Sequence, residues 1–156
     1  MKIAFTGTRN TDKNQSLIIR NKLQEIALID ATWYVGDAMG LDALVRIEAK
    51  RLSKELNIYV CQGKERYDFA KRSKQMVDAI CGANSKLYAF ANKACPSGCK
   101  PCKNPTGEGS GTWLTIAYAH YHGVPVEIIF LRDGLVAPDW LCSPTVSNHH
   151  QQLTLW

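Results

Sequence analysis

Short β-prone runs alternate with longer runs at helical spacing along most of this chain, and this alternation restricts the fold most strongly. We expect strands at residues 2–6, 32–35, 57–61, 86–91 and 126–131. We expect helices from the capping residue Asp12 to Ala27 and at residues 41–55, 66–80 and 113–122. Strands that alternate with helices predict an α/β fold. We expect a single Rossmann-like domain whose mainly parallel sheet has five or more strands and is flanked by helices.

The length of 156 residues allows one domain with a sizeable core and is too short for two ordinary ones. We place the Rossmann-like domain at residues 1–131, with a cysteine-rich insertion at residues 92–106. Residues 132–156 are expected to form a C-terminal tail. Trp140 and Trp156 predict that this tail packs on the domain.

Three polar turns that contain glycine each follow a predicted strand. They are Gly7-Thr8-Arg9 after the first strand, Gly36 to Gly40 after the second, and Gly107 to Thr112 after the fourth. Parallel strands end at the same edge of a sheet, so we expect the three turns to lie together there. Ligands bind at that edge in open α/β sheets, and it is therefore the predicted functional site.

The third turn, Gly107-Glu108-Gly109-Ser110-Gly111-Thr112, has the features of an anion site. Its glycines permit positive φ and let a ligand approach the backbone closely. The helix that follows offers unpaired N–H groups and the positive end of its dipole, and Ser110 and Thr112 add hydroxyl donors. Phosphate is the usual anion at such a position, although an ordinary flexible loop has a similar composition.

With these turns in place, the chain resembles the SLOG superfamily, a Rossmann-like group that includes the Lonely-guy phosphoribohydrolases and the DNA-processing protein A family. The similar segments are Thr6-Gly7-Thr8-Arg9, Val35 to Asp42, Arg72 in the third helix, and Gly107 to Thr112. The resemblance covers roughly residues 1–131 and is strongest to the small single-domain members, many of which have no assigned activity.

The resemblance implies a nucleotide or nucleotide-like ligand across the strand ends, with its phosphate on the turn at residues 109–112. It implies that Arg9 reaches the ligand and that Gly36 and Gly40 allow close approach. The ligand-binding residues expected on this basis are Gly7, Thr8, Arg9, Gly36, Asp37, Gly40, Asp42, Arg72, Gly109, Ser110, Gly111 and Thr112.

Two departures from the family pattern bear on activity. The Lonely-guy enzymes carry a catalytic glutamate soon after the glycine–threonine pair, whereas the residues after Thr112, from Trp113 to Ile116, include no carboxylate. Glycoside cleavage usually needs a carboxylate to stabilise charge or to activate water, so whether the chain is an enzyme stays open. In the third helix, Arg72 is followed by Ser73, where many small members carry asparagine.

Three functions are therefore weighed. The first is binding of a nucleotide-derived molecule in order to sense or sequester it. The second is hydrolysis like that of a nucleotide phosphoribohydrolase, with Asp37, Asp42 or Glu108 in place of the missing glutamate. The third is single-stranded nucleic-acid binding, which the mild net charge of +5 does not favour.

For several of these side chains, a structural role is an alternative to a functional one. Asp37 is either a capping residue or a ligand contact. Asp42 either braces Arg9 or Arg72, or binds a ribose hydroxyl or a metal. Trp113 either stacks on a base or lies in the core.

Three clustered cysteines, Cys95, Cys99 and Cys102, are not explained by the resemblance. Their spacing resembles part of a zinc knuckle, and three thiolates also suit an iron–sulfur cluster with one open iron. The alternative is free thiols, a disulfide or a redox pair. A bound metal would order the loop that carries the glycine turn. Candidates for a fourth ligand are Cys81, Cys142, His149 and His150.

No apolar run approaches the roughly 20 residues of a membrane span, and the N-terminus begins a strand rather than a signal peptide. We therefore expect a cytoplasmic protein without a membrane partner. A net charge of +5 fits an anionic small molecule and does not require nucleic acid. The apolar helices permit a homo-oligomer.

Overall fold

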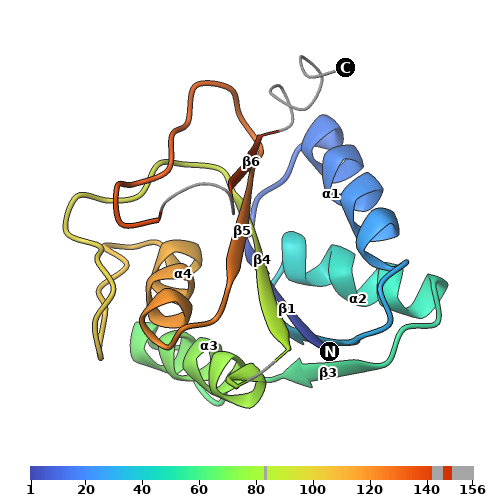
Figure 1. Cartoon of the computed structure of the whole chain (residues 1–156), viewed down its shortest axis with the longest axis horizontal. Helices are drawn as coiled ribbons and strands as arrows, with labels where there is room; N and C mark the ends of the chain where they lie inside the picture. The colour runs from blue at the N-terminus through green and yellow to red at the C-terminus, as the bar shows by residue number, and fades with distance from the viewer. Residues whose placement is uncertain (83, 142–145, 149–156) are drawn as a thin grey trace.

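The computed structural model describes residues 1–82, 84–141 and 146–148. These residues form a parallel sheet in which a helix connects each strand to the next from β1 to β5 (Figure 1). The strands are β1 (Lys2–Gly7), β2 (Thr32–Gly36), β3 (Leu56–Tyr59), β4 (Ser85–Ala91), β5 (Val126–Phe130) and β6 (Val146–Asn148). The helices are α1 (Lys13–Ile26), α2 (Leu41–Arg51), α3 (Arg66–Ile80) and α4 (Gly111–Tyr121).

The strand order in the sheet is β3-β2-β1-β4-β5-β6, and every neighbouring pair is parallel. The first strand lies in the middle of the sheet, where Ile3 is paired with Trp33 of β2 and with Lys86 of β4. This is the strand order of doubly wound dinucleotide-binding folds. The predicted α/β class and parallel sheet are confirmed.

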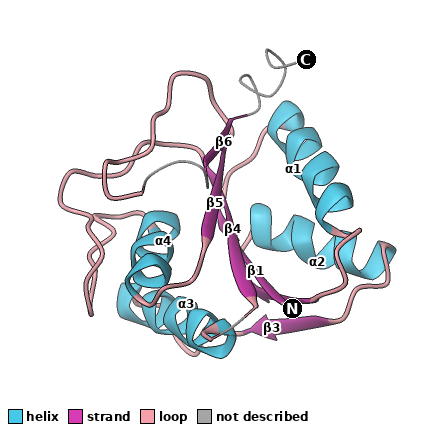
Figure 2. Ribbon diagram, in the orientation of Figure 1, coloured by secondary structure: helices cyan, strands magenta, loops and turns pink. Residues whose placement is uncertain are grey.

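Two layers of helices cover the sheet. Figure 2 shows α1 and α2 on one face and α3 and α4 on the other. Alternate side chains of each strand supply the two cores, so Ile3 and Phe5 pack with α1 and α2 whereas Ala4 packs with α3 and α4. None of the four helices described combines the length and the apolar character needed to cross a bilayer.

Local signals account for the helix starts. Asp12 caps α1 as predicted: its carboxylate accepts a 2.8 Å hydrogen bond from the Gln15 N–H, and the Gln15 side chain accepts one from the Asp12 N–H. The predicted helix at residues 41–55 was too long. It ends at Arg51 because Ser53 adopts a positive φ of 55° and reverses the chain.

Two strands, β3 and β6, depart most from the prediction. The third strand ends at Tyr59 rather than at residue 61, and the Cys61 N–H bonds to the Asp37 carboxylate instead of to a neighbouring strand. The sixth strand, β6, was not predicted. It has three residues and pairs with β5, with Ile128 beside Val146. A segment this short carries no periodicity that a sequence pattern reveals.

The C-terminal segment contacts α4 through Trp140. The Trp140 ring lies edge-on to that of Trp113 at 6.4 Å, and its indole N–H donates a 3.2 Å hydrogen bond to the Cys99 carbonyl. Trp156, which was also expected to pack on the domain, lies outside the described residues.

Candidate functional site

A cavity of about 1020 Å³ lies beyond the carboxyl ends of β1 and β4, where the strand order reverses. Its walls come from the loop after β1, the first half of α3, and the segment that joins β4 to α4. The predicted ligand residues that line it are Gly7, Thr8, Arg9, Asp42, Arg72, Gly109, Ser110, Gly111 and Thr112. Nine of the twelve predicted ligand residues therefore line this cavity.

The amino end of α4 opens into the cavity. Ser110 caps the helix, and its hydroxyl accepts a 3.2 Å hydrogen bond from the Trp113 N–H. The N–H groups of Gly111 and Thr112 belong to the first turn and have no intrahelical acceptor. A Cβ placed on Gly109 or Gly111 would meet open space, so an anion can approach this backbone without obstruction.

The glycine turn itself is tightly closed. The Ser110 N–H donates a 2.8 Å hydrogen bond to the Gly107 carbonyl, and a Cβ on Gly107 would collide with the Ser110 carbonyl. Gly109 has a φ of +91°, which a residue with a side chain rarely adopts. Gly107 and Gly109 thus shape the turn, while Gly109 and Gly111 leave the space in front of it empty.

Arg9 lines the cavity from the loop after β1. Its guanidinium stacks over the Phe69 ring of α3 at 4.5 Å, and the loop is anchored by the Thr8 N–H, which donates a 3.2 Å hydrogen bond to the Phe90 carbonyl. Arg9 makes no ion pair with any described residue. Its charge is available to an anionic ligand.

Arg72 reaches the cavity from α3 and is held by Asp37, because its Nη1 donates a 2.7 Å hydrogen bond to Oδ1. The second oxygen of Asp37 accepts a 3.1 Å hydrogen bond from the Cys61 N–H. Partial burial acts to raise the pKa of Asp37, but the Arg72 and Cys61 hydrogen bonds and the Arg72 charge outweigh it and lower that pKa. Asp37 does not line the cavity and serves instead to position Arg72.

Asp42 also lines the cavity and is only 6% exposed. Burial raises its pKa, against the opposing charges of Arg72 and Arg46 and a 3.2 Å hydrogen bond from the Ala38 N–H. Arg46 in turn donates 3.0 Å hydrogen bonds to the Gly36 and Ala38 carbonyls. Asp42 and Arg46 therefore hold the loop after β2, whereas the brace weighed for Asp42 was of Arg9 or Arg72.

Gly36 and Gly40 do not line the cavity, and the close approach that they allow is to the protein itself. A Cβ on Gly36 would lie 2.7 Å from Asp42 Oδ2 and 2.9 Å from Arg72 Cζ. A Cβ on Gly40 would lie 2.5 Å from the Thr8 carbonyl oxygen, and Gly40 has a φ of +69°. Gly40 therefore lets the loops after β1 and β2 pack together, and Gly36 leaves room for the side chains of Asp42 and Arg72.

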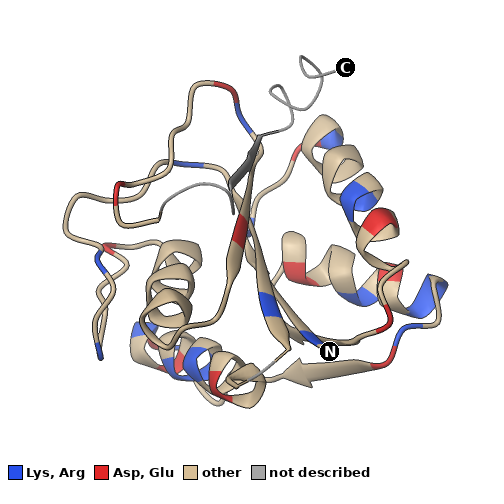
Figure 3. Cartoon of the chain, viewed as in Figure 1, with Lys and Arg blue, Asp and Glu red and all other residues tan. Residues whose placement is uncertain are grey.

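Sequence reasoning missed three cations on the cavity wall. Arg66 begins α3, Lys93 follows β4, and Arg132 follows β5. The carboxyl-end rule that identified the glycine turns would also have found Lys93 and Arg132. The charged residues of the described lining are Arg9, Arg66, Arg72, Lys93 and Arg132 against Asp42 and Glu108, a net positive wall. Figure 3 shows Lys and Arg along α3, with acidic residues between them.

Trp113 occupies the core and is fully buried, and its indole N–H donates a 2.9 Å hydrogen bond to the Lys93 carbonyl. Of the two roles weighed for Trp113, the structure shows the core role. An exposed ring is supplied instead by Tyr67 on α3, which lines the cavity and is 71% exposed.

The three clustered cysteines differ in exposure: Cys99 is buried, Cys95 is half-buried and Cys102 is exposed. Within the described part of the chain, no three or more His, Cys, Asp or Glu side chains are arranged to hold a metal ion. In this structure Cys95, Cys99 and Cys102 are therefore not arranged as the zinc or iron–sulfur site that was weighed for them against free thiols, a disulfide or a redox pair. Three candidates for a fourth ligand, Cys142, His149 and His150, lie outside the described residues.

No protein-family model and no curated protein matches the chain. Among solved structures, it is similar to DNA processing protein A (DprA) from Streptococcus pneumoniae, with a TM-score of 0.60 and 14% sequence identity. The match covers 98% of this chain and 56% of that protein, so the chain spans little more than half of the DprA length. The similarity shows a shared Rossmann-like fold over almost the whole chain.

Proposed function

We propose that the chain binds a nucleotide or a nucleotide-derived ligand in this cavity, with a phosphate on the turn from Gly107 to Thr112, and that it senses or sequesters that ligand. One observation carries the proposal: the open amino end of α4 faces a cavity whose described charged lining is mainly cationic. The N–H groups of Gly111 and Thr112 suit phosphate oxygens, and Arg9 can add a bidentate contact.

The cavity also suits the rest of a nucleotide. Its volume of about 1020 Å³ is at the upper end of ordinary ligand pockets, so it has room for a base, a ribose and more than one phosphate. Tyr67 offers an exposed ring for stacking on a base. If the ligand has a second phosphate, that phosphate would lie near the lining cations that do not contact the first one.

We further propose that the chain is a member of the SLOG superfamily. The ordered motifs after β1, after β2 and before α4 support this assignment, as does the fold shared with DprA. The catalytic glutamate of the Lonely-guy enzymes is missing from the first turn of α4, which favours binding over glycosidic cleavage. Hydrolysis by this chain would instead depend on Asp42 or Glu108, the two carboxylates of the described lining.

A second candidate function is binding of single-stranded nucleic acid. The similarity to a DNA processing protein and the cations along the cavity support it. In this reading the phosphates of successive nucleotides would contact Arg66, Arg72 and Lys93, and exposed Tyr67 would stack on a base.

Isothermal titration of the full chain with AMP, ADP, ADP-ribose and inorganic phosphate tests the first function. The matched variants are Arg9→Ala, on the cavity wall, and Lys50→Ala, on an exposed face of α2 outside the cavity. Binding of a nucleotide that is lost in Arg9→Ala and kept in Lys50→Ala would support the proposal. An absence of binding across the panel would contradict it.

Fluorescence anisotropy with single-stranded oligonucleotides of increasing length distinguishes the second function. Nucleic-acid binding predicts affinity that rises with length and falls steeply with salt, because counterions are released from several phosphates. A mononucleotide site predicts that a single nucleotide competes fully with the oligonucleotide. Release of free base from AMP in the same samples would identify a hydrolase.

A further inference from the structure

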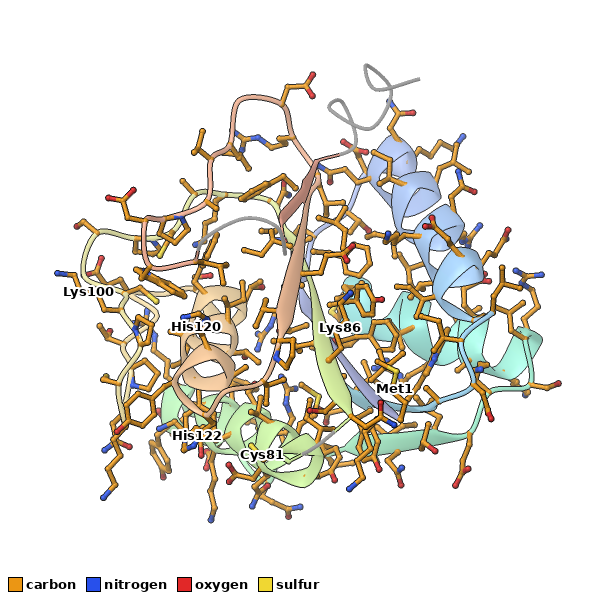
Figure 4. All side chains as sticks on the ribbon, in the orientation of Figure 1. Met1, Cys81, Lys86, Lys100, His120 and His122 are labelled. Carbon is orange, nitrogen blue, oxygen red and sulfur yellow. The ribbon has the colours of Figure 1, made fainter. Side chains whose placement is uncertain are left out.

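The segment between β4 and α4 is anchored in the core by Cys99. The Cys99 side chain is 1% exposed, and its S–H donates a 3.4 Å hydrogen bond to the Trp113 carbonyl in the first turn of α4. The Cys99 carbonyl accepts the 3.2 Å hydrogen bond from Trp140. Figure 4 shows the same segment at Lys100, on the outer side of α4, the helix that carries His120. Cys99 thus joins the loop, α4 and the C-terminal segment.

A second thiol lies beside this anchor. The Cys99 N–H donates a 3.0 Å hydrogen bond to the Pro96 carbonyl, which closes a turn and brings Cys95 back to Cys99. The Cys95 S–H contacts the Cys99 carbonyl at 3.5 Å and the Pro96 carbonyl at 3.4 Å, so the Cys95 sulfur lies beside the Cys99 backbone. Cys95 is half-buried, so small molecules reach it more readily than Cys99.

The same turn contacts the glycine turn of the cavity. The Glu108 carboxylate rests against Gly98, at a place that a Cβ on Gly98 would occupy. Glu108 and Trp113 flank the open amino end of α4, and each contacts the Cys95–Cys99 turn. A movement of Cys99 would therefore displace Glu108 and Trp113, the residues on the two sides of the proposed phosphate site.

We propose that Cys95 and Cys99 form a reversible disulfide, and that its formation releases the amino end of α4 and the glycine turn from their buried anchor. The reason is chemical. The Cys99 S–H donates to the Trp113 carbonyl, and a Cys99 sulfur bonded to Cys95 has no proton left to donate, so that hydrogen bond is lost. The oxidant is a low-molecular-weight disulfide such as oxidised glutathione.

The exchange takes two balanced steps. The Cys95 thiolate attacks one sulfur of the small disulfide, which forms a mixed disulfide and releases one thiol. Cys99 then loses its proton to water and attacks the Cys95 sulfur, which expels the second small thiolate, and that thiolate takes up a proton. Two protein thiols are oxidised to one disulfide, and one small disulfide is reduced to two thiols.

The environment of the pair makes this exchange slow in the folded protein. Burial, the neighbouring thiols and Glu108 raise the pKa of Cys99 to about 12, and burial together with Glu108 raises that of Cys95. Little thiolate exists near neutral pH, so we expect the rate to increase with pH. The pair therefore responds to sustained oxidising conditions rather than to brief ones.

Alkylation after incubation in glutathione buffers of decreasing reduced-to-oxidised ratio tests the pairing. All three cysteines fall in one tryptic peptide, residues 94–103, because trypsin cleaves after Lys93 and Lys103 but not between Lys100 and Pro101. Reduced protein should take three iodoacetamide groups on this peptide and oxidised protein one. The Cys102→Ser variant should take two iodoacetamide groups when reduced and none when oxidised. The Cys95→Ser variant should take two in both states.

Hydrogen exchange of the peptide that contains residues 107–114 measures the release of the turn without any ligand. We expect amide exchange there to be about tenfold faster in oxidised wild type than in reduced wild type, because one anchoring hydrogen bond is lost. Oxidised Cys95→Ser should show no change. Unchanged exchange in the disulfide form, pairing of Cys99 with any other cysteine, or stoichiometric zinc that protects all three thiols would overturn the proposal.

The effect on ligand affinity rests on the proposed function and forms a separate arm. We expect AMP to bind about tenfold more weakly to the oxidised protein. If AMP binds neither form while the disulfide still accelerates exchange, the proposed function fails and the disulfide proposal stands. If AMP binds both forms equally and exchange is unchanged, the disulfide proposal fails alone.

Discussion

The Arg72 guanidinium and the Asp37 carboxylate are joined by a 2.7 Å hydrogen bond that connects α3 to the loop after β2. Arg72 lines the cavity and Asp37 does not, so one partner of this ion pair faces the ligand while the other fixes its position. Removing either residue therefore has a different consequence for stability and for binding.

Replacing Asp37 by asparagine should lower the free energy of unfolding by about 1 kcal/mol at neutral pH, since the carboxylate is 33% exposed and solvent screens the pair. The lowered pKa of Asp37 means that its contribution is present above the ordinary value of 3.8 and is lost as the pH falls through the folded-state pKa. Urea unfolding at several pH values measures this, with Lys50→Ala as control. A constant difference between wild type and D37N down to acid pH would argue against the ion pair.

The contribution of Asp42 to stability should depend on pH in the opposite direction. Burial raises its pKa above 3.8, so the folded protein holds this proton more tightly than the unfolded chain. The contribution of Asp42 to stability is present below 3.8 and is lost as the pH rises through the folded-state pKa. Asp42→Asn does not titrate and can still accept the Ala38 N–H. Its stability relative to wild type should therefore rise with pH, which the same unfolding series would measure.

Replacing Arg9 by alanine should weaken nucleotide binding by about 10- to 100-fold, the loss expected for a charge-assisted hydrogen bond. Arg9 lies in an exposed loop and its main protein contact is the Phe69 ring, so we expect little change in the unfolding midpoint. Titration calorimetry and urea unfolding measure the two effects. Equal affinity of Arg9→Ala and wild type would remove Arg9 from the site.

Two glycines of the same turn should respond differently to alanine. Gly111→Ala places its Cβ in open space, so stability should be kept or raised by up to about 1 kcal/mol while ligand affinity falls. Gly107→Ala collides with the Ser110 carbonyl and should destabilise the protein by about 1–3 kcal/mol. Thermal unfolding with and without AMP separates these outcomes. Full ligand binding by Gly111→Ala would place the phosphate elsewhere.

Local sequence signals predicted the elements that local interactions determine. The Asp12 cap and the helix from Arg66 to Ile80 depend on residues a few positions apart, and both are found as predicted. The second helix was drawn too long because the reversal at Ser53 follows no strong turn signal. The short strand β6 depends on its pairing with β5, which no pattern within three residues indicates.

The position of the cavity could be predicted from the sequence, whereas the contacts made by its individual residues were harder to predict. The turns after the strands were identified because parallel strands end at one edge of the sheet. Gly36 and Gly40 were expected to face a ligand, but their role depends on Asp42, Arg72 and Thr8, which approach from other segments. The hydrogen bond from Cys99 to Trp113 likewise depends on how a loop folds over α4, which spacing alone does not encode.

The central position of β1 has a consequence for synthesis of the chain in the cell. Lys2 pairs with Thr32 on one side and with Ser85 on the other, so β1 leaves the ribosome long before its second neighbour. Until β4 emerges, the N–H and C=O groups along one side of an apolar strand are free to pair with another nascent chain. The yield of folded protein should therefore depend on how quickly the ribosome translates the codons between β2 and β4.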